Sequence, residues 1–225
     1  MENASVTATS QGGGANRVEE PGELTTLSAT ALADLLRRRR VTAREVVEAH
    51  IARARAVNPR VRAIVVDRYD AARAEAREAD RRFAEDDPAS WPPFLGVPCT
   101  IKESLALEGM PYTAGLVSRR GFVAAEDGSA TARLRQAGFI PLGVTNLSEL
   151  GMWMESRNKL YGTTCNPYDP TRTAGGSSGG EGAAVGSAMA PVGLAADIGG
   201  SIRMPAFFNG VFGHKPSARL VPITG

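Results

Sequence analysis

Two glycine-rich segments contain the residues of this sequence best suited to nucleophilic chemistry. Residues 175–182 read GGSSGGEG, which matches the Gly-x-Ser-x-Gly pattern of a nucleophile elbow twice and lacks the lysine of a phosphate-binding Walker loop. Residues 197–203 read DIGGSIR, where glycines before a serine let successive backbone N–H groups converge on a developing oxyanion. Each segment alone also fits a tight loop that needs glycine for positive φ. The candidate nucleophiles are therefore Ser177, Ser178 and Ser201.

The base that would activate such a serine has to be histidine or lysine. The chain has two histidines: His50, which we predict to be a structural residue of an amphipathic helix, and His214, which lies in a turn sequence. A Ser-His-Asp arrangement of Ser177, Asp197 and His214 can be assembled on paper. The basic residues are 23 arginines and only three lysines, and arginine cannot give up its proton. Lys102 follows an apolar stretch, where desolvation could lower its pKa and make it a base.

Composition narrows the class of protein. The 225 residues are 43% hydrophobic and 22% charged with a formal net charge of +2, which is typical of a globular protein and gives no reason to expect nucleic acid as a partner. Two cysteines, Cys99 and Cys165, are too few for a disulfide framework or a zinc cluster. No apolar run approaches the ~18 residues that cross a bilayer, and no secretory signal is apparent. We therefore expect a soluble, cytoplasmic protein.

The first part of the chain predicts helices. Residues 1–20 are polar, glycine-rich and aperiodic, so we expect a disordered arm. Ser28 can cap one helix, and Thr42 with Glu45 forms a capping box for a second helix that Asn58-Pro59 should end.

Further elements follow in the same region. We predict a strand over residues 61–66 and a charged helix over residues 70–85, with Glu78 placed to pair with Arg82. Four consecutive arginines at 37–40 fall at the end of the first helix, where cations suit the helix dipole, and this is favoured over a nucleic-acid patch.

Strands and helices alternate after Trp91-Pro92-Pro93, which we interpret as a boundary between an N-terminal helical region (21–90) and a catalytic core (91–225). Strands are expected at 97–101, 139–144 and 192–196, and helices at 129–137 and 182–190. This alternation predicts an α/β fold: a mainly parallel sheet covered by helices on both faces.

Three motifs resemble the amidase signature family. They are GVPCTIKE at residues 96–103, the GGSSGG run and the DIGGSIR segment, and the likeness continues to GHKPS at 213–217 and covers roughly residues 24–225. Segments 146–149 and 204–210 are most similar to the fatty-acid amide hydrolase type 2 branch. The resemblance implies a hydrolase of carboxylic amides without metal or cofactor, and its narrower form implies a fatty-acyl amide.

The resemblance also implies residue roles. Lys102 corresponds to the catalytic base, Ser177 to a bridging serine held by a cis peptide bond, and Ser201 to the nucleophile that forms an acyl-enzyme. The backbone N–H groups of Ile198, Gly199, Gly200 and Ser201 correspond to the oxyanion hole. Arg203 is a permanent cation and is expected to be structural.

The family's catalytic domain is longer than this chain, so we expect the chain to correspond to its N-terminal half. Alone it should associate or aggregate and turn over little substrate, because the apolar side chains of Phe207, Phe208, Val211 and Phe212 would lack covering partners. Three alternatives stay open: an inactive fragment or interaction protein, a protein of the amidotransferase branch that acts on aminoacyl-tRNA, and a histidine-based ester hydrolase.

Overall fold

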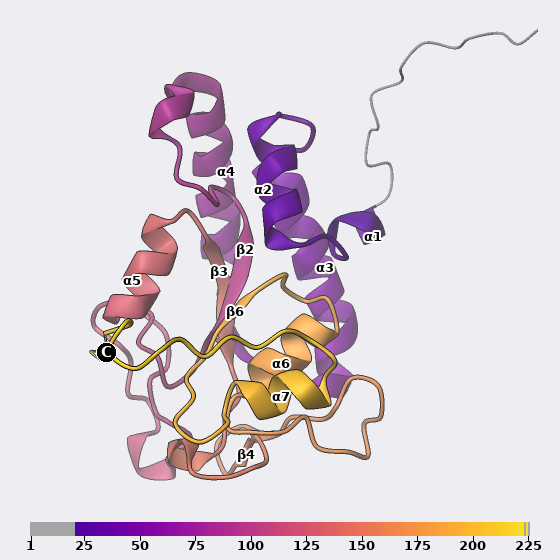
Figure 1. Cartoon of the computed structure of the whole chain (residues 1–225), viewed down its shortest axis with the longest axis vertical. Helices are drawn as coiled ribbons and strands as arrows, with labels where there is room; N and C mark the ends of the chain where they lie inside the picture. Colours follow the sequence, from indigo (N-terminus) through magenta and orange to yellow (C-terminus); the bar gives the residue numbers. More distant parts are fainter. Residues whose placement is uncertain (1–20, 223, 225) are drawn as a thin grey trace, which may run out of the picture.

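A four-stranded sheet in the order β1-β3-β2-β6 lies at the centre of the computed structural model, which describes residues 21–222 and residue 224 (Figure 1). The strands are β1 (Ile64–Asp67), β2 (Pro98–Lys102), β3 (Ile140–Thr145) and β6 (Gly193–Leu194). β2 runs parallel to both β3 and β6, and β1 pairs with β3 antiparallel. The prediction of a mainly parallel α/β sheet is confirmed.

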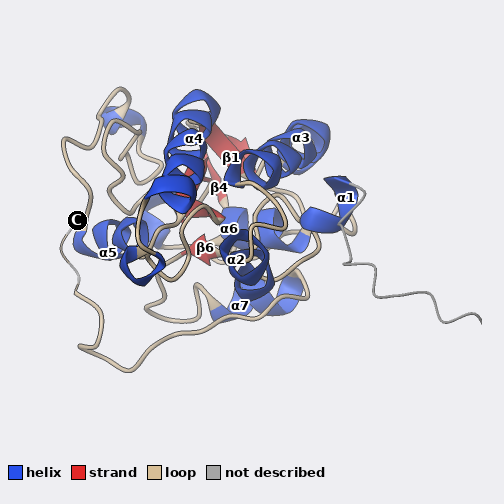
Figure 2. Ribbon diagram, turned by 90° about the horizontal axis from the view of Figure 1, so that it is seen from above, coloured by secondary structure: helices blue, strands red, loops and turns tan. Residues whose placement is uncertain are grey.

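Helices cover both faces of this sheet. Every residue of β2 and β3 is buried, as expected for parallel strands enclosed on two sides. Helix α4 (Tyr69–Glu85) lies on one face and α6 (Gly179–Gly186) on the other (Figure 2). Helix α6 begins three residues before the predicted start and ends at Gly186 rather than Ala190. Its glycines have poor helix propensity, but they allow a close approach to the strands that larger residues would block.

The N-terminal caps form as predicted. Helix α2 (Ala29–Arg37) is capped by the Ser28 hydroxyl, which accepts a hydrogen bond from the Ala31 N–H, and Thr42 and Glu45 form the capping box of α3 (Ala43–Val61). The predicted end of α3 at Asn58-Pro59 is wrong, because the helix continues to Val61 and closes through a left-handed residue at Arg62.

The Asn58 side chain explains why the chain turns after α3 and enters the sheet later than predicted. Its Oδ1 accepts hydrogen bonds from the Ala63 and Ile64 N–H groups at 2.9 Å, and its Nδ2 donates to the Ile64 carbonyl at 2.8 Å. These bonds cap the turn, so the strand predicted from residue 61 starts at Ile64.

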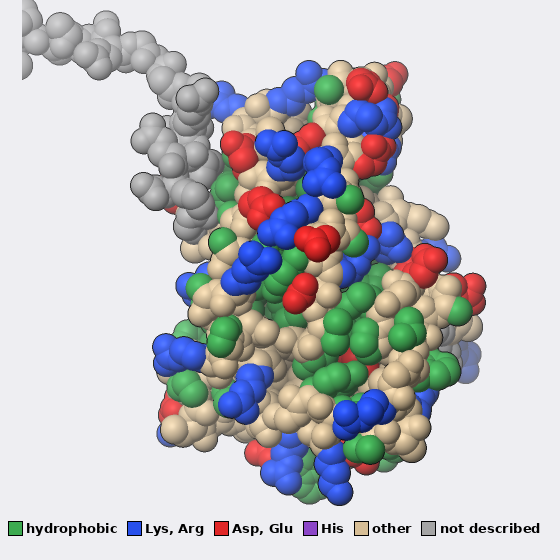
Figure 3. Space-filling view, turned by 180° about the vertical axis from the view of Figure 1, so that it is seen from behind, with side chains coloured by type: hydrophobic (Ala, Val, Ile, Leu, Met, Phe, Trp, Pro, Cys, Tyr) green, Lys and Arg blue, Asp and Glu red, His purple; other side chains and the backbone are tan. Residues whose placement is uncertain are grey.

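Charged side chains of the N-terminal helices make ion pairs and hydrogen bonds on the surface. The predicted Glu78–Arg82 pair is wrong: Glu78 pairs with Arg81, while Arg82 pairs with Asp86 one turn further on. Arg37 donates to the Trp91 and Pro92 carbonyls, so this member of the arginine run ties α2 to the chain that leads into β2. Figure 3 shows basic and acidic side chains interspersed over the helical end of the molecule.

The remaining elements are shorter. They are α1 (Pro21–Leu24), α5 (Ser129–Gln136), α7 (Arg203–Phe208), the short ladder of β4 (Arg157–Asn158) with β5 (Gly162–Thr163), and the 3-10 turns η1 (Pro88–Ser90), η2 (Val117–Arg119) and η3 (Glu149–Gly151).

One apolar cluster joins the helices to the sheet. It includes buried side chains before and after residue 90, such as Leu36 and Ala79 on the helices and Val97 and Leu142 on the chain that follows. The division into regions 21–90 and 91–225 stays a prediction, and the predicted arm at 1–20 lies outside the described residues. Within the described part of the chain, no helix combines the length and apolar character needed to cross a membrane.

His50 makes the stability of this core sensitive to acid. Its ring is fully buried in α3, with Nδ1 2.8 Å from the Val46 carbonyl oxygen, and burial lowers the pKa of His50 to about 4 from an ordinary 6.5. Between pH 6.5 and about pH 4 the His50 ring is protonated in the unfolded chain but stays neutral in the folded chain. The neutral ring therefore contributes stability that is present above pH 6.5 and lost as the pH falls towards 4.

We predict that His50→Leu removes this loss. Between pH 7 and pH 4 the free energy of unfolding, measured with urea, should fall by about 3 kcal/mol less in His50→Leu than in the parent chain. His214→Gln, at an exposed histidine, is the matched control and should follow the parent. Equal pH dependence of the parent and His50→Leu would contradict this account.

Candidate active site

Lys102 and Ser177 meet at the carboxyl end of the parallel strands. Lys102 is the last residue of β2 and is 2% exposed, and its Nζ lies 2.7 Å from the Ser177 Oγ in hydrogen-bond contact. Ser177 lies in the turn before α6, and the peptide bond between Gly176 and Ser177 is cis, as the resemblance implied. The structure thus brings together two residues that are 75 positions apart.

Burial changes the acid–base character of Lys102. It lowers the pKa of the amine to about 8, although the carboxylates of Glu181 and Asp197 act in the opposite direction. An amine with a pKa near 8 is neutral in a substantial fraction of molecules at slightly alkaline pH. Lys102 is therefore placed to accept a proton from the hydroxyl that it contacts.

The turn that carries Ser177 is held by the backbone and side chains around it. The Ser177 carbonyl accepts hydrogen bonds from the Ser148 N–H at 3.2 Å and from the Ser156 hydroxyl at 3.0 Å. Gly176 has no room for a side chain, because a Cβ there would lie 2.7 Å from the Trp153 carbonyl oxygen. These contacts fix the turn that brings the Ser177 hydroxyl against Lys102.

Asp197 organises the second glycine-rich segment. Its carboxylate accepts hydrogen bonds from the N–H groups of Gly200 and Ile202 at 2.8 and 3.0 Å. Arg203 pairs with the same carboxylate through Nε at 3.0 Å and Nη2 at 2.9 Å. The Arg203 guanidinium and these N–H groups hold the pKa of the Asp197 carboxyl well below its usual range. Arg203 has the structural position that was predicted for it.

Ser201 lies at the bend of this segment. It is half-buried, and its carbonyl accepts a hydrogen bond from the Ser178 N–H at 3.2 Å, which joins the two glycine-rich segments through their backbones. In the described part of the chain no hydrogen bond joins the hydroxyls of Ser201 and Ser177.

The four predicted oxyanion donors differ in their surroundings. The Gly200 N–H is engaged by Asp197, whereas the N–H groups of Ile198, Gly199 and Ser201 have no partner among the described residues. Ile198 and Gly199 are exposed. The segment therefore offers three free N–H groups among the described residues rather than four.

The alternative Ser-His-Asp arrangement is not assembled in the described residues. The Ser177 hydroxyl contacts Lys102, the Asp197 carboxylate is occupied by Arg203 and backbone N–H groups, and His214 is exposed. The geometry favours lysine over histidine as the base.

Sequence reasoning missed Glu181. This carboxylate on α6 is 4% exposed and accepts hydrogen bonds from the hydroxyls of Thr100 on β2 and Thr145 on β3. Burial raises the pKa of Glu181 to about 7. The sequence does contain one signal for Glu181, which is a single acidic residue inside a run of glycine and alanine. An acidic residue in a buried helix needs specific partners.

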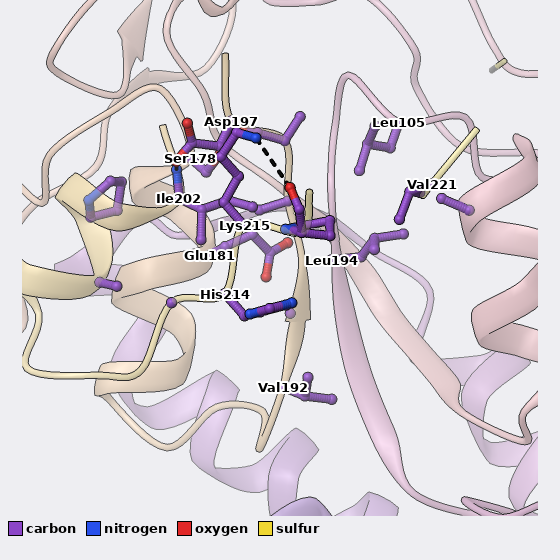
Figure 4. Close-up of a pocket in the computed structure, with 18 of the residues that line it drawn as sticks. Leu105, Ser178, Glu181, Val192, Leu194, Asp197, Ile202, His214, Lys215 and Val221 are labelled. Carbon is purple, nitrogen blue, oxygen red and sulfur yellow. Dashed lines mark hydrogen bonds between the residues drawn. The ribbon is translucent and has the colours of Figure 1, made fainter. Parts of the chain in front are cut away.

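A cavity of about 860 Å³ lies beside the two glycine-rich segments, although Lys102, Ser177 and Ser201 themselves do not line it (Figure 4). Ser178, Glu181 and Asp197 line one side of it, and Leu194 and Val221 are among the apolar side chains of its wall. Among the described residues, no group of three or more histidine, cysteine, aspartate or glutamate side chains is placed to hold a metal ion.

Large apolar side chains are exposed on two segments close to the site. They are Leu150, Met152, Trp153 and Met154 beside the Ser177 turn, and Ile198, Phe207, Phe208 and Phe212 around the Ser201 segment. The expectation that the three phenylalanines lack cover is confirmed, whereas Val211 is half-buried.

Known proteins are similar to this chain in sequence and in fold. The family model described as Amidase matches residues 45–225, and the chain belongs to the amidase signature family. It is 51% identical over 214 residues to fatty-acid amide hydrolase 2 of Homo sapiens, covering 92% of this chain and 40% of that protein.

Two further comparisons extend this result. The chain is 40% identical to the indoleacetamide hydrolase of Bradyrhizobium diazoefficiens over 87% of this chain and 37% of that protein. The solved structure of native peptide amidase from Stenotrophomonas maltophilia matches with a TM-score of 0.82 and 31% identity over 89% of this chain and 42% of that one. The chain spans about two-fifths of the length of these relatives.

The contact between α6 and the strand end predicts a stability effect at Gly180. A Cβ there would lie 2.5 Å from the backbone N and O of Asn146, and backbone cannot move aside as a flexible side chain can. Alanine would gain at most about 1 kcal/mol of helix propensity over glycine. We expect the clash to outweigh this gain, so that Gly180→Ala lowers the free energy of unfolding by about 1 to 3 kcal/mol.

The free energies of unfolding of Gly180→Ala and of a control variant, Gly199→Ala, are measured by chemical denaturation. Nothing lies within 4 Å of a Cβ at Gly199, so that variant should keep the stability of the parent. Equal stabilities of the two variants would show that α6 does not require the close approach at Gly180.

Proposed function

We propose that this chain carries the nucleophile and base of a serine amidase, in which Lys102 acts through Ser177 on Ser201. The observation that carries the proposal is the 2.7 Å contact between the buried Lys102 amine and the Ser177 hydroxyl. Membership of the amidase signature family supports it, because the matched residues 45–225 include all three positions.

The proposed chemistry is a proton relay followed by acyl transfer. Neutral Lys102 accepts the Ser177 hydroxyl proton while Ser177 takes the proton of Ser201. The Ser201 Oγ then attacks the carbonyl carbon of the amide. The electron pair of the carbonyl moves to oxygen, and the N–H groups of Ile198, Gly199 and Ser201 stabilise the oxyanion.

Collapse of this intermediate breaks the carbon–nitrogen bond, and the leaving amine takes a proton from Ser177, which is resupplied by protonated Lys102. An ester of Ser201 remains. Water attacks this acyl-enzyme with the same relay as base and releases the carboxylic acid, so that Ser201, Ser177 and neutral Lys102 are restored.

We further propose an amide with an apolar acyl group as the substrate class. The human relative is named fatty-acid amide hydrolase 2, and exposed side chains such as Trp153 and Phe208 give this chain apolar surface close to both glycine-rich segments. An apolar acyl chain would cover surface of this kind.

A fluorophosphonate probe tests the identity of the nucleophile. It should form one adduct, on Ser201, because this hydroxyl alone would combine the relay with free oxyanion donors. Peptide mapping by mass spectrometry locates the adduct, and Ser201→Ala should abolish it. Ser118→Ala, at an exposed serine away from the motifs, should leave labelling unchanged.

Two results would count against the proposal. An adduct on Ser177 or Ser178 would favour the nucleophile-elbow interpretation of the first segment. Absence of any adduct on the folded chain would favour an inactive interaction protein.

A further inference from the structure

Glu181 and Lys102 lie on the same face of the sheet. Side chains alternate along a strand, so Thr100 and Lys102 of β2 point to one face, and Thr145 of β3 is the register partner of Lys102. Glu181 accepts a hydrogen bond from each of these two threonines, at 2.7 Å from the Thr145 hydroxyl. The carboxylate is therefore fixed beneath the strand position that carries the amine.

The site around Glu181 is built to hold a carboxylate. Gly193 on β6 leaves the space that the group fills, because a Cβ at this position would lie 1.8 Å from the Glu181 Oε2. Two hydroxyl donors and a glycine on three neighbouring strands thus surround one buried acid. Their arrangement does not bind the Lys102 amine directly, since the hydrogen bond of Lys102 goes to Ser177.

We propose that Glu181 is a positioning residue that sets the proton affinity of Lys102 through space, and this inference rests on the relay proposed above. A buried amine with no negative neighbour would hold a proton too weakly to draw one from a serine hydroxyl. The Glu181 carboxylate offsets part of that desolvation. Glu181 accepts its hydrogen bonds from Thr100 and Thr145 and not from Ser177. The Lys102 amine therefore stays available to the Ser177 hydroxyl.

Other ionisable groups lie near Lys102 and Glu181. Asp197 also favours the protonated form of Lys102, but its carboxylate is paired with Arg203. Cys99, on the same strand as Lys102, feels the charge of Glu181, and burial raises the pKa of its thiol. His214 and Lys215 line the cavity that Glu181 also borders, and both are exposed. Among the described residues, Glu181 is thus the acid acting on Lys102 that has no arginine partner.

The proposal predicts a change that can be observed directly on the amine. The chain has only three lysines, so ¹³C labelling at lysine Cε gives three NMR signals, and the signal lost in Lys102→Ala identifies Lys102. In Glu181→Gln, whose side chain can still bond to both threonines, the pKa of Lys102 should fall by about 1 to 3 units. The signals of Lys159 and Lys215 should be the same in Glu181→Gln and in the parent.

Glu103→Gln is the matched control. Glu103 is buried and follows Lys102 in the sequence, but its carboxylate accepts hydrogen bonds from Thr113 and Tyr161 and is not among the groups that act on Lys102. This variant should leave the titration of Lys102 in place. Thr145→Val provides a second test, because loss of one donor makes the Glu181 anion less stable and should also lower the pKa of Lys102.

The outcomes separate this inference from the proposed function. An unchanged Lys102 titration in folded Glu181→Gln, or an unchanged titration in Thr145→Val if Glu181→Gln does not fold, would overturn the role of Glu181. Labelling of Ser201 that survives Lys102→Ala would overturn the relay, whatever the titration shows. A fall in the pKa with Glu181→Gln but not with Glu103→Gln supports the inference.

Discussion

The contact between the Lys102 amine and the Ser177 hydroxyl is the interaction on which the rest of the structure depends. It joins the end of a central strand to the turn before α6, and it requires an amine to lose nearly all contact with water. Desolvation of a cation is unfavourable, so the chain must supply compensating charge and a fixed partner. The glycines of the turn and of α6 fix the partner, Ser177, in place, because they let the helix start against the strand backbone.

The carboxylates of Asp197 and Glu181 supply the compensating negative charge in different ways. Asp197 is tied to Arg203 and to the N–H groups of its own loop, so its main effect is to shape the segment that carries Ser201. Glu181 is enclosed between α6 and the strands, with two threonine hydroxyls as partners. Asp197 therefore organises the segment that carries Ser201, and in the proposed relay Glu181 acts on Lys102.

Local signals in the sequence predicted much of this arrangement. Ser28, Thr42 and Glu45 act within a few residues of themselves, so their caps could be predicted, and the apolar stretch before Lys102 predicted its strand and its burial. The extension of α3 past Pro59 goes with the turn that the Asn58 side chain caps at residues 63 and 64. The start of α6 depends on a tertiary contact, the close approach of Gly180 to the Asn146 backbone. Glu181 was missed for the same reason, since its partners come from strands 81 and 36 positions away.

The measurement that tests the central claim most directly is the rate of fluorophosphonate labelling of Ser201 as a function of pH. If neutral Lys102 is the base, the rate rises with pH along a limb centred near pH 8, the pKa that burial gives to this amine, and falls by about 10²- to 10⁴-fold in Lys102→Ala. Lys159→Ala, at an exposed lysine, keeps the profile of the parent. A limb that persists unchanged in Lys102→Ala would contradict the assignment of Lys102 as the base.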